Sequence, residues 1–506
     1  IAAIIKPGYA LLENELGVRL FPVLMGTAFI YLLELLTRPK RLLLFYLTIV
    51  SIGAFHFLSF LALPDMPLLF FTALFLYLYR SYIDKDNWLT ALLLAITTTL
   101  LLLSKYHGVL VIGFTILANP RILLRLSFWM IPILSAAMFA PHVLWQFTHD
   151  LPSIKYHLSE RSAGGYKIEN TLNYILSALL VFSPVVGIVL AWHTIKARPG
   201  NIFHRTLKLL LAGTLLFFLA MTLKGRAEAN WVAIALVPAI VYGYRMCEDK
   251  VWFPKFIRTA ATISLILILP LRAYLVYDFL PDSPQLAYTK ETLHHTKKWA
   301  EQLQQKAGDR PVVFMNKYQY AAWYEYYTGH QSISLNNRMG RKNQYNIWND
   351  EFEIQGKDVM LVPNYYIPTL DSIETAKGLF QYQYIENFRS ASAVVVSPDS
   401  ACITTEKSGE IEVSFSLSVN GNIDLDINAN TSFAPVIHAL VLQNGKLVSD
   451  NSLEFYIKNE MLKSGDSYSV NIKAPAEAGT YELYLDVTMG SLPPAINGRK
   501  INLTVR

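Results

Sequence analysis

Apolar runs follow one another with short polar gaps from Leu20 to Leu280, and the pattern then changes to that of an ordinary soluble protein. A helix needs roughly 20 apolar residues to cross a bilayer core of about 30 Å. The candidate spans are Leu20–Thr37, Leu42–Leu63, Pro67–Tyr82, Leu89–Leu103, Val109–Ala118, Leu123–Phe147, Thr171–Trp192, Thr206–Leu223, Asn230–Tyr244 and Phe256–Phe279. The pattern predicts a polytopic α-helical membrane bundle of about ten spans.

The fifth candidate, Val109–Ala118, is short, because ten helical residues rise only about 15 Å. The distribution of Lys and Arg favours keeping it. If alternate loops are inside, the inner loops hold 15 Lys and Arg and the outer loops hold 6, and cytoplasmic loops are normally the richer ones. This orientation predicts a multi-pass membrane protein with its C-terminal domains on the extracytoplasmic side. The bacterial cytoplasmic (inner) membrane is the location implied by the family resemblance described below.

Two further domains are predicted after the transmembrane domain (1–280). In 281–400, an amphipathic helix at Thr289–Gly308 and strand-like runs at Pro311–Met315 and Asp358–Val362 are typical of an α/β domain. In 401–506, apolar and polar residues alternate strictly from Glu410 to Leu417. Further strand-like runs lie at Ile423–Ile427, Ile437–Leu442, Leu453–Ile457, Tyr468–Ile472, Tyr481–Val487 and Ile501–Val505. Seven short strands favour an immunoglobulin-like β-sandwich, and we expect Ile403–Arg506 to fold alone.

Composition supports the membrane interpretation, since only 16% of the residues are charged, against about a quarter in soluble proteins. The net charge of +6 comes from residues between hydrophobic segments, so no nucleic acid partner is expected. The two cysteines, Cys247 and Cys402, are predicted on opposite sides of the membrane, which leaves no disulfide framework or zinc motif. The chain opens at Ile1 with a loop-like stretch, Lys6-Pro7-Gly8, and we expect an N-terminal part to be missing.

Polar side chains gather at the predicted outer ends of the helices. They are Asp65, Lys105, Tyr106, His107, His142, His149, Arg161, Lys224, Arg226 and Glu228. Each has a structural alternative: Asp65 could be a helix N-cap, Lys105 could snorkel to the interface, and the others could be interfacial or solvated. Their convergence on one face favours a site, because polar groups at membrane depth are expensive and tend to mark function.

The same stretches carry a resemblance to a known family. The order Gly17-Val18-Arg19, Pro64–Leu68, Ser104-Lys105-Tyr106, Pro141–Trp145 with His149, and Glu228–Trp231 resembles membrane glycosyltransferases of the GT-C type. More narrowly, it is similar to bacterial relatives of protein O-mannosyltransferases and of the lipid A aminoarabinose transferase. The resemblance covers Ile1 to Phe279.

The resemblance implies transfer of a sugar from a polyprenyl-phosphate donor to an extracytoplasmic lipid, glycan or protein acceptor. It implies a general-base aspartate in a first outer loop, upstream of Ile1. Lys105 is then the first candidate for the donor phosphate, helped by Arg161, Lys224 and Arg226. Asp65 would orient the acceptor or help to hold a divalent metal ion, should the enzyme use one. The pocket would include His107, His142, His149 and Glu228.

Two other classes remain open from the sequence. A transporter or flippase of a lipid-linked or anionic substrate would need the same spans, but such proteins often show internal repeats and broken helices near the midplane. Neither is evident here, and the polar residues lie at one face. A surface protein whose sandwich binds partners would need far fewer spans for its anchor.

Overall fold

The computed structural model describes the whole chain except residues 150, 156–165, 349 and 421–433. The chain forms two compact units, Ile1–Tyr274 (unit 1) and Leu275–Arg506 (unit 2). The division falls six residues before the predicted end of the transmembrane domain at 280, just before the last helix of unit 1 ends at Val276.

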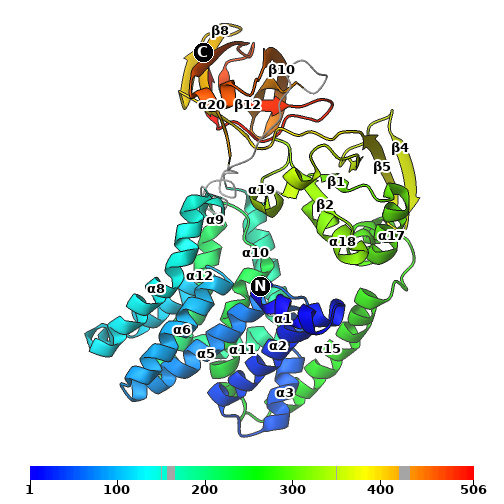
Figure 1. Cartoon of the computed structure of the whole chain (residues 1–506). Helices are drawn as coiled ribbons and strands as arrows, with labels where there is room; N and C mark the ends of the chain where they lie inside the picture. The colour runs from blue at the N-terminus through cyan, green and yellow to red at the C-terminus, as the bar shows by residue number, and fades with distance from the viewer. Residues whose placement is uncertain (150, 156–165, 349, 421–433) are drawn as a thin grey trace. The chain divides into compact units, whose positions relative to one another are not determined.

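Unit 1 is helical (Figure 1). Its principal helices are α1 (Ala2–Leu11), α2 (Glu15–Thr37), α3 (Leu42–Val50), α4 (Gly53–Leu58), α5 (Asp65–Asp84), α6 (Trp88–Ser104), α7 (Gly108–Ala118), α8 (Leu126–Thr148), α10 (Ile168–Val181), α11 (Ile188–Lys196), α12 (Ile202–Met221) and α15 (Phe253–Val276). The stretch from Ala229 to Cys247 combines 3-10, α and π turns in η4 (Ala229–Ala235), α13 (Leu236–Pro238), η5 (Ala239–Gly243) and α14 (Tyr244–Cys247). One apolar core joins these helices, except α1, which contributes no residue to it.

The described residues contain six helices long and apolar enough to cross a membrane, or seven if α10 and the helix after it form one span bent by 93°. The apolar helices α6 and α7 are shorter. The polytopic bundle is thus confirmed, whereas the count of ten spans stays a prediction. The predicted span Leu42–Leu63 is divided, because α3 ends at Val50 and α4 begins at Gly53. Broken helices, which were not evident from the sequence, are therefore present in the bundle, and their absence no longer argues against a transporter.

The N-terminal stretch corrects one expectation. Lys6-Pro7-Gly8 does not form a loop but lies inside α1. A proline removes one hydrogen bond from a helix interior, yet α1 packs closely against α2. A Cβ atom at Gly8 would lie 2.3 Å from the carbonyl oxygen of Gly17. The two backbones therefore touch, and this contact explains a helix that the local pattern did not predict.

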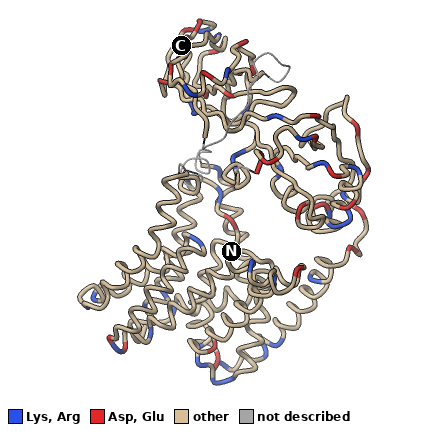
Figure 2. The backbone as a smooth tube through the Cα atoms, viewed as in Figure 1, with Lys and Arg blue, Asp and Glu red and all other residues tan. Residues whose placement is uncertain are grey.

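Polar contacts between elements identify which residues lie at each end of unit 1. At one end, the Lys40 amide donates to Glu248 at 3.0 Å, and the Arg125 guanidinium donates to the carbonyl oxygen of Ile83 at 2.9 Å. At the other end, Lys105 contacts Asp65. Since Asp65 and Ile83 lie at opposite ends of α5, the segment from Lys105 to Arg125, which includes α7, runs the length of that helix. Figure 2 shows many charged residues of the bundle gathered at one end.

Unit 2 begins with an α/β part. Its sheet has the order β2 (Ser332–Leu335), β1 (Val312–Met315), β3 (Val359–Val362), β5 (Gly378–Ile385) and β4 (Asp371–Thr375), and only the pairs that involve β1 are parallel. The accompanying helices are α16 (Pro284–Leu293), α17 (Thr296–Ala307), α18 (Tyr318–Thr328), α19 (Gln344–Trp348) and η6 (Asp350–Ile354). The single helix predicted at Thr289–Gly308 is interrupted at His295, whose φ is +59°.

The remainder of unit 2 consists of two sheets that share a core. One has the order β10 (Lys446–Tyr456), β9 (Val436–Gln443), β12 (Gly479–Thr488), β13 (Ile501–Val505) and β7 (Cys402–Thr405); the other has β11 (Ser467–Lys473), β8 (Glu410–Val419) and β6 (Val394–Pro398). The short helix α20 (Met461–Ser464) lies between β10 and β11 in the chain. The predicted strand Ile423–Ile427 falls outside the described residues.

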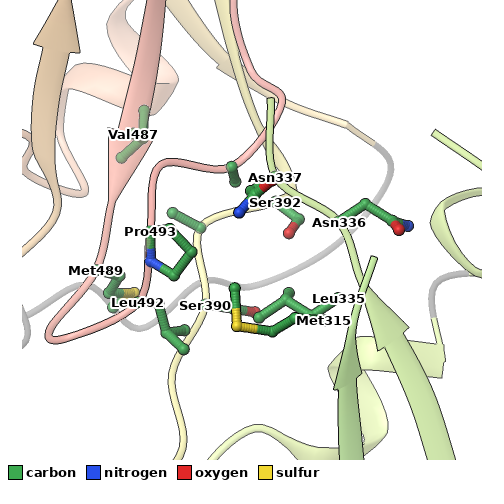
Figure 3. A pocket seen from close by; sticks show the side chains of 12 residues that line it. Met315, Leu335, Asn336, Asn337, Ser390, Ser392, Val487, Met489, Leu492 and Pro493 are labelled. Atoms are coloured by element: carbon green, nitrogen blue, oxygen red, sulfur yellow. The ribbon is translucent and has the colours of Figure 1, made fainter. Parts of the chain in front are cut away.

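Strand β6 precedes the predicted domain start at 401, and a fragment beginning at Ile403 lacks it. The immunoglobulin-like classification and the independent folding of this fragment stay predictions. The α/β part and the two sheets also pack together. Figure 3 shows Met315 and Leu335 opposite Met489, Leu492 and Pro493. The cavity between them is only ≈ 10 Å³, about the space of one water molecule.

Candidate active site

The centre of the candidate site is a buried charge cluster at one end of unit 1. The Lys105 ammonium lies 2.8 Å from Oδ1 of Asp65, and the Asn230 side-chain amide donates to Oδ2 of Asp65 at 2.9 Å. The Asp65 side chain is only 2% exposed and that of Lys105 is 18% exposed. A buried carboxylate must be paired or hydrogen-bonded to stay charged. Both oxygens of Asp65 therefore have a partner.

Local sequence explains how these side chains come together. Pro64 occupies the N-cap position of α5 and Asp65 its first turn, where a negative charge is favoured by the helix dipole. Asp65 is therefore not the N-cap that the sequence left open. Lys105 follows the last residue of α6, and its backbone is extended. Its ammonium points to a buried carboxylate, so the snorkelling alternative is not what the structure shows.

A cavity of ≈ 800 Å³ opens beside Lys105. Six of the polar residues singled out from the sequence line it: Lys105, Tyr106, His107, His142, Lys224 and Arg226. The remaining wall is largely apolar, with side chains such as Leu102, Phe217, Met221 and Trp231. A mostly apolar cavity with a few convergent polar groups is the usual form of a ligand site. The cationic residues give this cavity a preference for anions.

Tyr106 and His142 form a second polar group on the cavity wall. The Tyr106 hydroxyl lies 2.7 Å from Nε2 of His142. The Gln146 amide donates to Ser153 at 3.0 Å and lies 3.4 Å from the Tyr106 hydroxyl. This network joins the turn after α6 to the end of α8. It brings the Tyr106 hydroxyl and the His142 imidazole to the cavity wall, and both groups suit the hydroxyls of a sugar or a headgroup.

The other two candidate histidines, His107 and His149, lie against aromatic side chains. The His107 ring is 4.8 Å from that of Trp231 and 5.2 Å from that of Phe218, measured between ring centroids. His149 stacks on Trp145 at 4.6 Å but does not line the cavity. His107 is thus part of the wall, whereas the structure places His149 at the exposed end of α8.

The predicted phosphate-binding cations differ in their surroundings. Arg226 lies 3.5 Å from Glu228 in an exposed pair. Lys224 lines the cavity, whereas Glu228 does not. Arg161 falls outside the described residues. Lys105 is the best buried of the described cations among the predicted set, and its position depends on Asp65.

Asn230 is the residue that sequence reasoning missed. It stands in the quoted stretch Glu228–Trp231, but a lone asparagine at the start of an apolar segment carries no signal of its own. Its role depends on Asp65, 165 residues earlier in the chain. Only the packing of η4 against α5 brings the two together.

The described residues do not form an evident metal site. Within the described part of the chain, no group of three or more His, Cys, Asp or Glu side chains could hold a metal ion. The Asp65 oxygens are occupied by Lys105 and Asn230. A divalent metal therefore remains only an expectation from the resemblance.

Three comparisons with known proteins bear on this site. The family model for dolichyl-phosphate-mannose-protein mannosyltransferases matches residues 4–148. Lipid A galacturonosyltransferase RgtD from Rhizobium johnstonii is 24% identical over 265 residues, which are 50% of this chain and 55% of the relative. The chain thus matches about half the length of this curated relative.

Among solved structures, ArnT from Cupriavidus metallidurans is similar both in its apo state and bound to undecaprenyl phosphate. Each comparison has a TM-score of 0.53 and covers 75% of this chain and 86% of ArnT, with sequence identities of 14% and 12%. At such identities the likeness concerns the fold. The three comparisons agree, and they confirm the resemblance of this chain to membrane glycosyltransferases of the GT-C type.

Proposed function

We propose that the full protein transfers a sugar from a polyprenyl-phosphate donor to a lipid acceptor, in the cavity beside Lys105. The observation that carries the proposal is a partly buried lysine, oriented by the buried Asp65, at a cavity of ≈ 800 Å³. The likeness to ArnT, one structure of which holds undecaprenyl phosphate, supports the donor class. The similarity to a lipid A galacturonosyltransferase supports a lipid acceptor.

The reaction places clear demands on the site. The acceptor hydroxyl oxygen forms a bond to the anomeric carbon, while the bond from that carbon to the phosphate oxygen breaks. The polyprenyl phosphate leaves with the bonding electrons, and a base takes the hydroxyl proton. Charge thus develops on the phosphate, and a cation positioned beforehand stabilises that charge without reorganising.

Lys105 meets this demand. An ammonium group has three donors, and Asp65 accepts from one of them. Because Lys105 also lines the cavity, the group can contact a phosphate while Asp65 holds it. We assign Asp65 and Asn230 to positioning Lys105, instead of the acceptor-orienting role expected for Asp65 from the sequence. Lys224 and Arg226 add positive charge at the same cavity.

The proposal also includes sidedness: the site and unit 2 lie outside the cytoplasm, as the 15-to-6 distribution of Lys and Arg indicates. Single cysteines introduced in unit 2 should react with an impermeant maleimide in intact cells. Cysteines in the stretch 193–208 should react only after the membrane is permeabilised. Labelling of that stretch in intact cells would contradict the orientation.

The function is tested with the full-length protein in membranes, a labelled polyprenyl-phosphate sugar and lipid A as acceptor. We expect label to move to the acceptor, free polyprenyl phosphate to appear in equal amount, and Lys105→Ala to lower both. Lys85→Ala is the matched control, because Lys85 follows the opposite end of α5. If the intact donor crossed the membrane without losing its sugar, the transporter class would replace this proposal.

A further inference from the structure

A second large cavity in unit 1 shares no residue with the candidate active site. It measures ≈ 900 Å³. One wall is α15, with Phe256, Ile263 and Leu267, and the other is the bent region between α10 and α11, with Leu180 and Val186. Its lining is almost entirely apolar. We call it the α15 groove.

The polar groups at the deep end of the α15 groove are satisfied within the protein. The hydroxyls of Ser183 and Ser264 both donate to the carbonyl oxygen of Ser51, at 2.9 and 3.0 Å. Ser51 is the C-cap residue of α3. An occupant of this end therefore needs no hydrogen-bonding groups and makes only apolar contacts.

The length of the groove indicates what kind of occupant fits. From Lys255 to Ile268, both in the lining, the rise along α15 is roughly 20 Å. Half of a bilayer's hydrocarbon core measures about 15 Å. The groove thus extends from one end of the bundle to about the depth at which the two leaflets meet. That is the path of one acyl chain of a membrane lipid.

The mouth of the groove favours a negative charge. Lys255 lines it and lies in the first turn of α15, where the helix dipole adds positive potential. Lys250 and Arg258 stand close to it in sequence, whereas the neighbouring acids Glu248 and Asp249 are both bonded to Lys40. Trp252 also lines the mouth, and tryptophan is enriched at the level of lipid headgroups. Val251, beside it, is 98% exposed.

We propose that the α15 groove binds an anionic diacyl phospholipid, with the phosphate at Lys255 and one acyl chain along α15. The charge at the mouth selects an anionic headgroup, and the apolar groove takes the chain. This site is separate from the cavity beside Lys105 and does not depend on the function proposed for it. By the charge distribution along the chain, the lipid comes from the inner leaflet.

Native mass spectrometry of the detergent-solubilised full chain tests the proposal, with phosphatidylglycerol and phosphatidylcholine as probes. We expect phosphatidylglycerol to bind more tightly and Lys255→Gln to lower its affinity about fivefold, the effect of one cation near an anionic lipid. Lys85→Gln removes the same charge in the loop after α5 and should leave binding unchanged. Phosphatidylcholine binding should not respond to Lys255→Gln.

A second variant tests the chain path. Ile263 is half exposed and lines the groove, so Ile263→Trp should fill it and abolish the tight binding without disturbing the core. Equal binding of the two phospholipids, or wild-type affinity in both variants, would overturn the proposal. So would displacement of phosphatidylglycerol by equimolar polyprenyl phosphate, or a photo-crosslinker at position 263 that joins two copies of the chain.

Discussion

Two buried ion pairs, one in each unit, differ in what surrounds them. Lys105 and Asp65 lie beside a cavity of ≈ 800 Å³ in unit 1. Arg338 and Asp486 lie in unit 2, where the α/β part meets the two sheets, and the cavity in that region is only ≈ 10 Å³. Both carboxylates are almost wholly buried. Burial and charge alone therefore do not distinguish the two pairs.

The pair in unit 2 is fully enclosed by its own contacts. Arg338 donates through Nε and Nη2 to the two oxygens of Asp486, at 2.7 and 2.6 Å, and Nη2 also donates to the carbonyl oxygen of Gly498. The backbone amides of Asn497 and Gly498 donate to Asp486 at 2.9 Å. Such a pair holds two parts of a fold together. The pair in unit 1 instead presents an ammonium group to an open cavity, which is what a ligand site needs.

The largest effect that we expect is on the stability of unit 2. Asp486→Ala leaves the largely buried Arg338 without its carboxylate, and breaking a buried pair in this way costs about 3–5 kcal/mol. Hydrogen–deuterium exchange of β12 and β13 in the full-length protein should accelerate accordingly. Asp450→Ala, which removes an exposed partner of His438, should change exchange little. An unchanged exchange rate in Asp486→Ala would contradict the claim that this pair stabilises unit 2.

The next effect concerns Lys105 and catalysis. A charge-assisted contact to phosphate contributes roughly 1.5–3 kcal/mol, so Lys105→Ala should lower sugar transfer about tenfold to a hundredfold at equal membrane expression. Lys105→Arg should recover only part, because a planar fork does not reproduce a compact ammonium. Transfer from a polyprenyl-phosphate sugar in membranes measures both. A fully active alanine variant would remove Lys105 from the site.

Asn230 should show a smaller effect that depends on Lys105. Asn230→Ala removes one hydrogen bond to the Asp65 carboxylate, and we expect transfer to fall by up to about tenfold. Because Asn230 acts through Asp65 and Lys105, the double variant with Lys105→Ala should be no less active than Lys105→Ala alone. Additive losses would show that Asn230 has a separate role, such as contact with the acceptor.

The last effect is a pH dependence of stability and concerns a third charged group, Lys377, which lies half-buried at a cleft of ≈ 660 Å³ in unit 2. Burial lowers its pKa to about 8, and Glu291 offsets only part of the shift. Between about pH 8 and pH 10.4 the unfolded state then binds more protons at this residue, so its contribution to the free energy of unfolding rises with pH.

Lys377→Met should remove that contribution. Urea unfolding in detergent, followed by tryptophan fluorescence, should show a smaller gain in stability from pH 7 to pH 10 in the variant than in the wild type. The Lys377 ammonium lies 4.9 Å from the centroid of the Trp323 ring, so the fluorescence of Trp323 responds to changes in this region. Identical pH profiles would mean that Lys377 titrates normally.

The sequence predicted the helical bundle and several polar residues of the cavity wall, because both follow from local patterns. Apolar runs mark helices, and the alternation of loops places Asp65, Lys105 and His142 at one end. The break at Ser51 could not be predicted in this way. No proline or charge marks it, and its carbonyl oxygen is satisfied by Ser183 and Ser264, 132 and 213 residues away.

Long-range contacts also explain why the helix at Pro7-Gly8 and the roles of Asn230 and Arg338 were not predicted. The Pro7-Gly8 pattern is typical of a loop, but the contact of Gly8 with Gly17 stabilises a helix. Asn230 and Arg338 acquire their roles only from partners more than a hundred residues distant. Patterns with periods of two to four residues carry no information about such pairs.

The ion pair of unit 1 also has a consequence for biosynthesis. Ribosomes add about 5–20 residues per second, so Lys105 is made roughly 2–8 s after Asp65, whereas Asn230 follows Asp65 by roughly 8–33 s. Between those two times both members of the ion pair have been synthesised, whereas Asn230, the second partner of Asp65, has not. The cluster is complete only when η4 joins the bundle, so a nascent chain that stops before residue 229 carries a half-built site.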